Sequence, residues 1–319
     1  MSLDQDTLHQ LLDTIRRFVR NRLMPLEEQV ASTDQIPESV ISEMRELGLF
    51  GLTIPEEYGG LGLNTEEECK VAIELGYTSA AFRSVIGTNN GIGSQGLVMD
   101  GTDDQKENYL PRLASGEIIG SFALTEPNVG SDSANVQTKA EKDGDSYILN
   151  GTKRWITNAN IANLFTVFAR TDQSQKGSSG VSAFLVDANT PGISLSSKYK
   201  KMGQQGAHVC DVIFDNCRVP EVNIIGGPNN VNNGFKTAMK TLDRGRIHIS
   251  AFAVGCAKRL IEVSTQFSLE REQFGQSISN FQMIQAMLAE SQTECYAAET
   301  MVFDAAQRRD RGEKVNLHA

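Results

Sequence analysis

The stretch LTEPNVGSD, residues 124–132, gathers several groups that could bind a ligand. It offers two hydroxyls, one glycine and two carboxylates: Thr125, Ser131, Gly130, Glu126 and Asp132. The glycine permits close approach between a ligand and the backbone, and the hydroxyls supply hydrogen bonds. The two carboxylates have the composition of an acid/base pair. The same residue types also build irregular loops with capping side chains, so a binding loop and a structural loop are both open.

The only tryptophan of the chain lies in GTKRWITN, residues 151–158. In a strand, Trp155 and Thr157 would point to the same face. A flat indole beside a hydroxyl donor suits the face and the edge of a planar heterocycle. The alternative is that Trp155 is buried in the hydrophobic core, which is common for a tryptophan in a strand.

Arg246 falls on an apolar helical stripe, where an arginine needs a partner because its charge cannot be removed. That partner is either Asp243, one turn earlier on the helix, or a ligand. A further stretch, REQFGQSISNFQ, covers residues 271–282. It offers a cation, an aromatic ring and an amide, or it is a solvated turn between two helices.

The composition excludes several classes of protein. A net charge of −10 makes general binding of nucleic acid or of an anionic membrane unfavourable. The N-terminus MSLDQDTLHQ is not a signal peptide, and no apolar run is long enough to span a membrane. Five scattered cysteines without a CxxC pair, and four histidines without HExxH, predict reduced thiols, no metal site and a cytoplasmic protein. No GxGxxG, Walker or GxSxG motif occurs.

The elements that must position these residues fall into three regions, which predict a multidomain α+β protein. The N-terminal region, residues 1–118, shows apolar residues at helical spacing. TEEE at 65–68 and TDDQ at 102–105 have the composition of capping boxes that open helices. Gly48 and Gly116 are predicted to end helices. We therefore expect an N-terminal all-α domain.

Residues 119–226 change to a strand-like pattern. The strand-like segments of this region are IIGSFAL, VQTKAEK, SYILN, NLFTVFA, VSAFLVD and CDVIFDN. The dipeptides Asp143-Gly144 and Asn150-Gly151 are predicted tight turns between strands. Short strands without helices between them predict an antiparallel β-barrel or sandwich as the middle domain.

Residues 227–319 are predicted to form a C-terminal helical bundle with two long helices. Apolar residues alternate steps of four and three over residues 235–267, and a similar stripe covers residues 284–305. Two helices cannot enclose a bundle core, so we expect partners from elsewhere in the chain, a second subunit or residues beyond this sequence. Gly312 is predicted to stop the second helix before a further one.

Together these stretches resemble the acyl-CoA dehydrogenase family over nearly the whole chain, except for the C-terminal end of the last domain. The matching text is IPEEYGGLGL (54–63), FALTEPNVGSD (122–132), NGTKRWITN (150–158), KMGQQG (201–206), FDNCRVP (214–220), LDRGRIHISA (242–251) and REQFGQSISNFQ (271–282). The motifs follow the family order at family-like spacing. The helical–β–helical plan expected from periodicity agrees with this resemblance.

The resemblance implies FAD as the cofactor and an acyl-CoA thioester as the substrate. It places a flavin-cradling loop at 122–131, an isoalloxazine-flanking stretch at 155–157 and a contact to the CoA end of the substrate at 243–246. The implied FAD-binding residues are Phe122, Ala123, Leu124, Thr125, Gly130, Ser131, Trp155, Ile156, Thr157, Arg271, Phe274 and Gln282. The implied substrate-binding residues are Ser131, Asp243, Arg244, Gly245 and Arg246. Arg271 and Gln282 resemble residues that reach the FAD of a neighbouring subunit.

The implied reaction is α,β-dehydrogenation of the acyl-CoA to the trans-2-enoyl-CoA, as in fatty-acid β-oxidation. A glutamate removes the α-proton, a hydride passes to flavin N5, and an electron-transferring flavoprotein takes the electrons. The resemblance also implies a homo-oligomer, either a dimer or a tetramer built from dimers. Two alternatives share this architecture: a flavin oxidase or monooxygenase, and a naturally truncated homologue that binds ligands without turnover.

The resemblance gives no catalytic base within this chain. In two branches of the family the glutamate precedes the arginine of the LDxxR-like segment, and that position is Gly245 here. In most other branches it lies in a later loop, which is expected beyond Ala319. Glu262, Glu270 and Glu272 are near in sequence but match neither pattern.

Overall fold

The structure is a computed structural model that describes residues 3–318, and the chain divides into two units. The sheet unit contains Glu28–Gly62 and Ala81–Leu242. The helical unit contains Met1–Glu27, Leu63–Ala80 and Asp243–Ala319. The predicted class is confirmed, because helices precede a middle curled sheet and long helices follow it.

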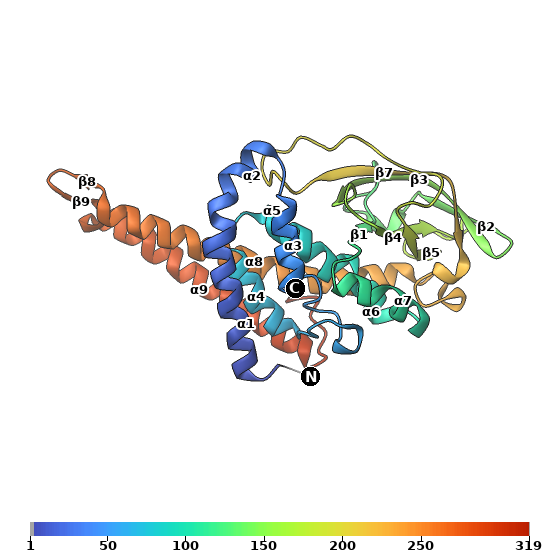
Figure 1. The fold of residues 1–319 in the computed structure, drawn as a ribbon, viewed down its shortest axis with the longest axis horizontal. Helices are drawn as coiled ribbons and strands as arrows, with labels where there is room; N and C mark the ends of the chain where they lie inside the picture. The colour runs from blue at the N-terminus through green and yellow to red at the C-terminus, as the bar shows by residue number, and fades with distance from the viewer. Residues whose placement is uncertain (1–2, 319) are drawn as a thin grey trace. The chain divides into compact units, whose positions relative to one another are not determined.

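The helical unit is built from segments that are far apart in sequence (Figure 1). Its helices are α1 (Gln5–Phe18), a π-helix (Val19–Leu23), a 3-10 helix (Met24–Leu26), α4 (Thr65–Leu75), most of α8 (Gly234–Glu270) and α9 (Gln282–Asp310). A two-stranded hairpin, β8 (Glu272–Gln273) and β9 (Gln276–Ser277), joins α8 to α9. As predicted, Gly312 has a left-handed φ of 78° just after α9 ends.

Helix α4 packs against α1 and α9 and is capped twice at its start. The capping box joins Asn64 to Glu67, so it begins one residue earlier than the predicted TEEE box. The Asp310 carboxylate, at the end of α9, accepts from the backbone N–H groups of Thr65 and Glu66, each at 2.9 Å. The positive end of the α4 dipole thus receives a carboxylate from a segment 245 residues away.

The helices α4 and α8 approach closely where glycine faces glycine. A Cβ added at Gly255 would lie 2.1 Å from the Ile73 carbonyl oxygen and 2.9 Å from the Gly76 Cα. Such distances leave no room for a side chain. Glycine at both positions therefore sets how closely these two helices pack.

The sheet unit surrounds a seven-stranded sheet with short helices. Its helices are α2 (Glu27–Thr33), α3 (Glu38–Glu46), a 3-10 helix (Glu56–Tyr58), α5 (Ala80–Thr88), a π-helix (Asn89–Gly93), α6 (Gln95–Asp100) and α7 (Asp103–Ala114), with 3-10 turns at Ser133–Asn135, Glu221–Asn223 and Pro228–Asn230. Its strands are β1 (Gly120–Ala123), β2 (Lys139–Asp143), β3 (Ser146–Thr157), β4 (Leu164–Arg170), β5 (Val181–Asp187), β6 (Ile193–Leu195) and β7 (Val209–Pro220). The predicted stops at Gly48 and Gly116 are confirmed by left-handed φ angles of 69° and 72°.

The strand order is β1-β4-β2-β3-β7-β6, and β5 pairs with β4 on a side branch. Most pairs are antiparallel, as predicted, whereas β1 and β2 run parallel to β4. One hydrophobic core is formed by side chains of β2, β3, β4, β5 and β7. In a second hydrophobic core, α6, α7 and the first turns of α8 pack against β4 and β5.

The two predicted turns have different outcomes. Asp143-Gly144 is a turn, because β2 and β3 pair directly across it from Asp143 to Ser146. Asn150-Gly151 is not a turn and lies inside β3, where the register with β7 shifts. A Cβ at Gly151 would lie 2.6 Å from the Thr138 hydroxyl oxygen, so the glycine permits close packing of two segments. Among the described residues, no helix is both long and apolar enough to cross a membrane.

Candidate active site

In the sheet unit, the residues after β1 run beside the last residues of β3. The Arg154 N–H donates to the Thr125 carbonyl at 2.8 Å, and the Ser121 hydroxyl donates to the Thr157 carbonyl at 2.6 Å. The two stretches that resemble flavin-contacting segments are therefore neighbours in space. They are far apart in sequence, and the sheet brings them together.

A β-bulge sets the direction of Trp155. Between the ladder positions of Lys153 and Ile156, two residues of β3 oppose the single residue Asp211 of β7. The Asp211 carboxylate accepts from the Trp155 N–H and from the Arg154 Nε, each at 3.3 Å. Trp155 takes a left-handed φ of 57°, and 59% of it is exposed. The alternative that Trp155 is a core residue is therefore wrong.

Thr157 lines a concavity of about 310 Å³ in the sheet unit. The other lining residues are Ser84, Lys201, Gly203, Gln204, Ala207 and Val209. Just after Thr157, Asn158 has a φ of 63° and is held by the Ser84 and His208 carbonyls, each at 2.9 Å. The end of β3 is thus fixed at the edge of this concavity, next to the KMGQQG stretch.

Several polar groups of these segments have no protein partner. Within residues 3–318, the hydroxyls of Thr125, Ser131 and Thr157 and the indole N–H of Trp155 make no hydrogen bond. By contrast, the side chains of Ala123, Leu124 and Ile156 are buried in the hydrophobic cores, so only their backbone can reach a ligand. Phe122 packs on Phe168 with ring centroids 4.8 Å apart.

Glu126 is a structural carboxylate. It is buried and accepts from the Gln137 N–H at 2.7 Å, from the Thr138 N–H at 2.9 Å and from the Thr138 hydroxyl at 2.5 Å. It also accepts from the Lys153 ammonium at 2.7 Å. Asp132, the other carboxylate of the loop, is exposed and accepts from the Asn135 side chain. The two do not form an acid/base pair, whereas Gly130 and Ser131 lie exposed between them.

Burial raises the pKa of the Glu126 carboxyl, but the Lys153 charge and the hydrogen bonds outweigh it and hold that pKa below its ordinary value. Burial also lowers the pKa of Lys153 to about 8, although Glu126 acts in the opposite direction. Both groups are therefore charged at neutral pH, inside a region from which water is excluded.

In the helical unit, the 243–246 segment lies on α8. Arg246 is exposed and donates to Asp243 at 2.7 Å, which is the pairing that spacing suggested. Arg244 is buried instead, with its Nε 2.7 Å from Glu68 and another nitrogen 3.2 Å from the Leu63 carbonyl. Its side chain therefore belongs to a structural network. The groups of this segment that reach the surface are those of Asp243, Gly245 and Arg246.

Glu68 is the centre of that network. His248 Nδ1 lies 3.0 Å from one carboxylate oxygen, and Arg244 binds the other. Burial raises the pKa of Glu68, but Arg244 and His248 outweigh burial and hold it at about 2. Glu68 is therefore ionised in the folded protein at any ordinary pH.

The predicted turn at 271–282 is the β8–β9 hairpin and the start of α9. Phe274 is 93% exposed and has a φ of 54°. Arg271 and Gln282 are exposed too, and among the described residues the Arg271 guanidinium contacts no acidic group. These three side chains are free to contact a partner or a ligand.

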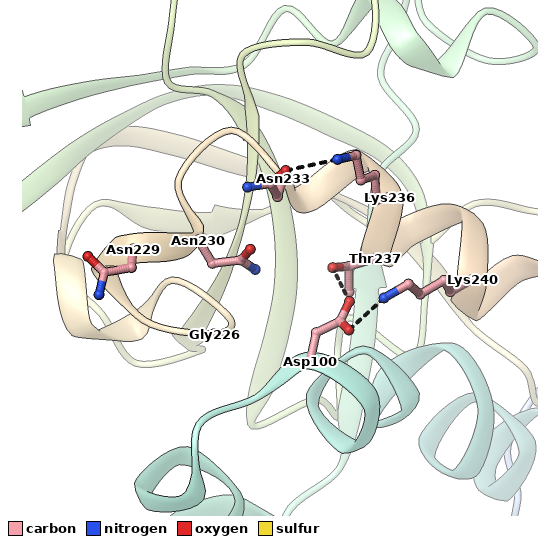
Figure 2. A pocket seen from close by; sticks show the side chains of 8 residues that line it. All are labelled: Asp100, Gly226, Asn229, Asn230, Asn233, Lys236, Thr237 and Lys240. Atoms are coloured by element: carbon pink, nitrogen blue, oxygen red, sulfur yellow. Dashed lines mark hydrogen bonds and ion pairs between the residues drawn. The ribbon is translucent and has the colours of Figure 1, made fainter.

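A second cavity of about 470 Å³ lies in the sheet unit at the start of α8, and no predicted site residue lines it (Figure 2). Its Asp100 carboxylate is occupied by the Thr237 hydroxyl at 2.6 Å and the Lys240 ammonium at 2.8 Å. In the described part of the chain, no group of three or more His, Cys, Asp and Glu residues could hold a metal ion.

Comparison with known protein families shows to which family the chain belongs. The N-terminal, middle and C-terminal domain models of the acyl-CoA dehydrogenases match residues 5–117, 121–217 and 232–319. The chain belongs to the acyl-CoA dehydrogenase family.

Three similar proteins illustrate the breadth of the acyl-CoA dehydrogenase family. The probable acyl-CoA dehydrogenase YngJ of Bacillus subtilis is 40% identical over 307 residues, which cover 96% of this chain and 80% of that protein. The structure of a glutaryl-CoA dehydrogenase from Mycobacterium smegmatis in complex with FADH2 is 30% identical, with a TM-score of 0.90, covering 99% of this chain and 79% of that one. The prolyl acyl carrier protein oxidase AnaB is 31% identical, with a TM-score of 0.92 and coverages of 99% and 83%.

In this acyl-CoA dehydrogenase, sequence reasoning missed three residues, two in the sheet unit and one in the helical unit. Lys153 and Glu68 are buried charges, and Asp211 holds the bulge at Trp155. Lys153 stands two residues before Trp155, so a regular strand would place both side chains on the same face. From the sequence alone, Lys153 therefore cannot be distinguished from a surface lysine. Only the tertiary structure, in which Lys153 and Glu126 are buried as a pair, identifies it as an internal charge.

Proposed function

We propose that this protein catalyses FAD-dependent α,β-dehydrogenation of an acyl-CoA thioester. The observation that carries the proposal is the group of unpartnered hydroxyls and the exposed indole where the segment after β1 meets the end of β3. Support comes from the match of all three family domains and from the related structure with FADH2.

The residues at this place fit FAD. An exposed indole held in a left-handed conformation offers a flat apolar face, and Thr157 offers a free hydroxyl at the edge of a concavity. Backbone and hydroxyl groups of Phe122–Thr125, Gly130 and Ser131 would hold the remainder of the cofactor. Bound FAD would supply the acceptor for the hydride that leaves the β-carbon.

The chain's own groups would bind and orient the thioester. Ser131, the half-exposed Asp243 and Gly245, and the exposed Arg246 are proposed to contact the acyl-CoA, with Arg246 offering a cation for a phosphate. The thioester oxygen gains negative charge as the α-proton leaves, so hydrogen-bond donors aimed at it lower the barrier. Exclusion of water would strengthen those hydrogen bonds.

The carboxylate that takes the α-proton is proposed to lie beyond Ala319. The three glutamates near Gly245 in sequence do not match the base positions of the family. Glu262 accepts from the Tyr77 hydroxyl at 2.7 Å, and Glu270 accepts from Gln266. Glu272 lies exposed in the β8–β9 hairpin.

We also propose that Arg271, Phe274 and Gln282 reach the FAD of a neighbouring subunit, in a homo-oligomer of two or four chains. Their exposure on the β8–β9 hairpin and the free guanidinium of Arg271 support this assignment. An electron-transferring flavoprotein is the proposed acceptor of electrons, in a cytoplasmic β-oxidation reaction.

The test uses the protein produced from its complete reading frame. It should be isolated with a flavin absorption spectrum, and acyl-CoA esters added without oxygen should bleach that spectrum. Thr157→Val is the matched variant, since it removes only the unpartnered hydroxyl. A protein that binds FAD but keeps its colour with acyl-CoAs of every chain length and branching would contradict the proposal.

A second candidate, a flavin oxidase, is favoured by the likeness to AnaB. The two functions differ in how the reduced protein meets oxygen. Rapid reoxidation in air with release of hydrogen peroxide would support the oxidase. Slow reoxidation in air, with fast reoxidation by an electron-transferring flavoprotein, would support the dehydrogenase.

A further inference from the structure

A buried ion pair lies directly behind the proposed flavin-facing segments. The side chain of Lys153 is 0% exposed and that of Glu126 is 2% exposed. Their Nζ and Oε1 atoms are 2.7 Å apart. Neither group takes part in the proposed reaction, and both differ from the exposed ion pairs elsewhere in the chain, such as Arg112 with Glu117.

The Lys153 ammonium also donates to the Leu124 carbonyl at 3.1 Å. One charge on β3 thus binds both a backbone group and a side chain of the segment that follows β1. Between these two contacts lies Thr125, whose carbonyl accepts from the Arg154 N–H at 2.8 Å. Three consecutive residues, from Leu124 to Glu126, are therefore tied to two consecutive residues of β3.

Glu126 extends the connection to a third segment. Its two carboxylate oxygens accept from the backbone N–H groups of Gln137 and Thr138 and from the Thr138 hydroxyl. The pair therefore joins three segments: the residues that follow β1, the residues just before β2 and the bulged part of β3. Two of these segments carry the exposed Trp155 and the free hydroxyls of Thr125 and Thr157.

A buried ion pair is weak evidence for stability, because desolvation of both charges offsets their attraction. Its best-attested use is to fix register, since a displaced charge would lose its partner in a medium of low polarity. At the bulge of Arg154 and Trp155 the Asp211 side chain replaces the regular ladder hydrogen bonds with β7, whereas the Lys153–Glu126 pair aligns this part of β3 with the segment after β1.

We propose that the Lys153–Glu126 pair is a positioning device that fixes the spacing between the Leu124–Thr125 segment and Trp155–Thr157, and so sets the site that receives the flavin. This inference rests on the proposed function for the identity of the ligand. The alignment of the two segments itself can be measured without any ligand.

Trp155 is the only tryptophan among residues 1–319, so all indole fluorescence of this stretch of chain comes from that one position. Lys153→Met removes the charge and the hydrogen bond to Leu124. In the flavin-free protein, acrylamide should then quench Trp155 more efficiently than in the wild type, and the emission spectrum should shift. The affinity for added FAD should fall about tenfold, which is the scale of one lost hydrogen bond to a positioned group.

Two further variants separate positioning from stability. Lys153→Met combined with Glu126→Gln leaves no lone buried charge, so its melting temperature should recover part of the loss, whereas its Trp155 quenching and FAD affinity should stay impaired. Val219→Ala opens a cavity in the same hydrophobic core, where Val219 pairs with Tyr147 at the far end of β3. It should lower the melting temperature without changing Trp155 quenching.

The outcomes are distinguishable. If the double variant regains stability with wild-type quenching and FAD affinity, or if Val219→Ala changes quenching as Lys153→Met does, the positioning role is refuted. If the wild-type protein binds no FAD, the proposed function fails, and the quenching series alone then decides whether the pair aligns the two segments.

Discussion

Thr157 is a residue whose side chain we propose to bind the flavin. Its carbonyl is bonded to Ser121, but within the described residues its hydroxyl is unpartnered, at the edge of a concavity. We predict that Thr157→Val weakens FAD binding about tenfold, on the scale of one hydrogen bond. The free energy of unfolding should change by less than about 0.5 kcal/mol, because no protein contact is lost.

Fluorescence titration with FAD and thermal unfolding of the flavin-free protein give the two quantities. Thr157→Ser keeps the hydroxyl and is the matched control, which should retain most of the affinity. Wild-type affinity in Thr157→Val, with a loss only in Thr157→Ser, would mean that the methyl group, and not the hydroxyl, matters.

Lys153 gives the stability of the sheet unit a dependence on pH. Its folded-state pKa of about 8 lies below the ordinary value of 10.5. Between these two pH values the unfolded chain holds the proton and the folded protein has released it, so this group makes stability rise with pH. The contribution is on the order of 1–3 kcal/mol across that window.

Other groups titrate in the same range, so the informative quantity is the difference in the free energy of unfolding between the wild type and a variant without Lys153. Urea unfolding of the wild type and of Lys153→Met is compared from pH 7 to pH 10.5. The wild type should gain stability relative to the variant as the pH rises. A constant difference between the two proteins would show that Lys153 titrates normally.

At the scale of elements, the crossing of α4 and α8 depends on glycine. Gly255→Ala would place a methyl group 2.1 Å from the Ile73 carbonyl oxygen, so the helices must separate. We predict a loss of about 1–3 kcal/mol or more in the free energy of unfolding. Ala253→Ser, at an exposed position on the same helix, should have little effect. Equal stabilities by urea unfolding would contradict the close packing.

The sequence could predict the elements whose signals are local, and it could not predict those set by distant residues. The stripes of α8 and α9, the turn at Asp143-Gly144 and the stops at Gly48 and Gly116 follow from periodicity and turn chemistry. Asn150-Gly151 has the composition of a turn, but its glycine is needed because Thr138 packs against it.

The same contrast holds for the candidate site. The chemistry of Trp155 and Thr157 left a binding role and a core role open, and the resemblance favoured binding. The exposure of Trp155 depends on a bulge that Asp211 holds from another strand. Lys153 and Glu126 were overlooked as a pair because 27 residues separate them. Contacts of that kind are fixed by tertiary packing and leave no periodic signal in the sequence.

At the scale of the whole molecule, α8 presents an apolar stripe. Leu260, Val263 and Phe267 are 66%, 59% and 58% exposed. Contiguous exposed apolar groups of this kind indicate an association surface. We predict that Val263→Glu lowers the molecular mass measured by light scattering. Val222→Glu, at an exposed valine in the sheet unit, is the control and should leave the mass unchanged.

The same mass for wild type and Val263→Glu over a wide range of concentration would exclude this stripe as a subunit contact. The net charge of −10 acts against association in general, which makes any assembly that does form depend on such apolar contacts.

The carboxylate of Asp310 at the start of α4 has a consequence for the order of events on the ribosome. Thr65 leaves the peptidyl transferase centre 245 residues before Asp310 is added, which is roughly 10–50 s at ordinary rates of synthesis. The sheet unit is fully synthesised by Leu242, so its segments can assemble during that interval. The helical unit must wait, with the first N–H groups of α4 relying on Asn64 and water until the carboxylate arrives. We therefore expect the helical unit to fold later, and chains that end at residue 242 and are released from the ribosome should have a protease-resistant sheet unit and an accessible α4.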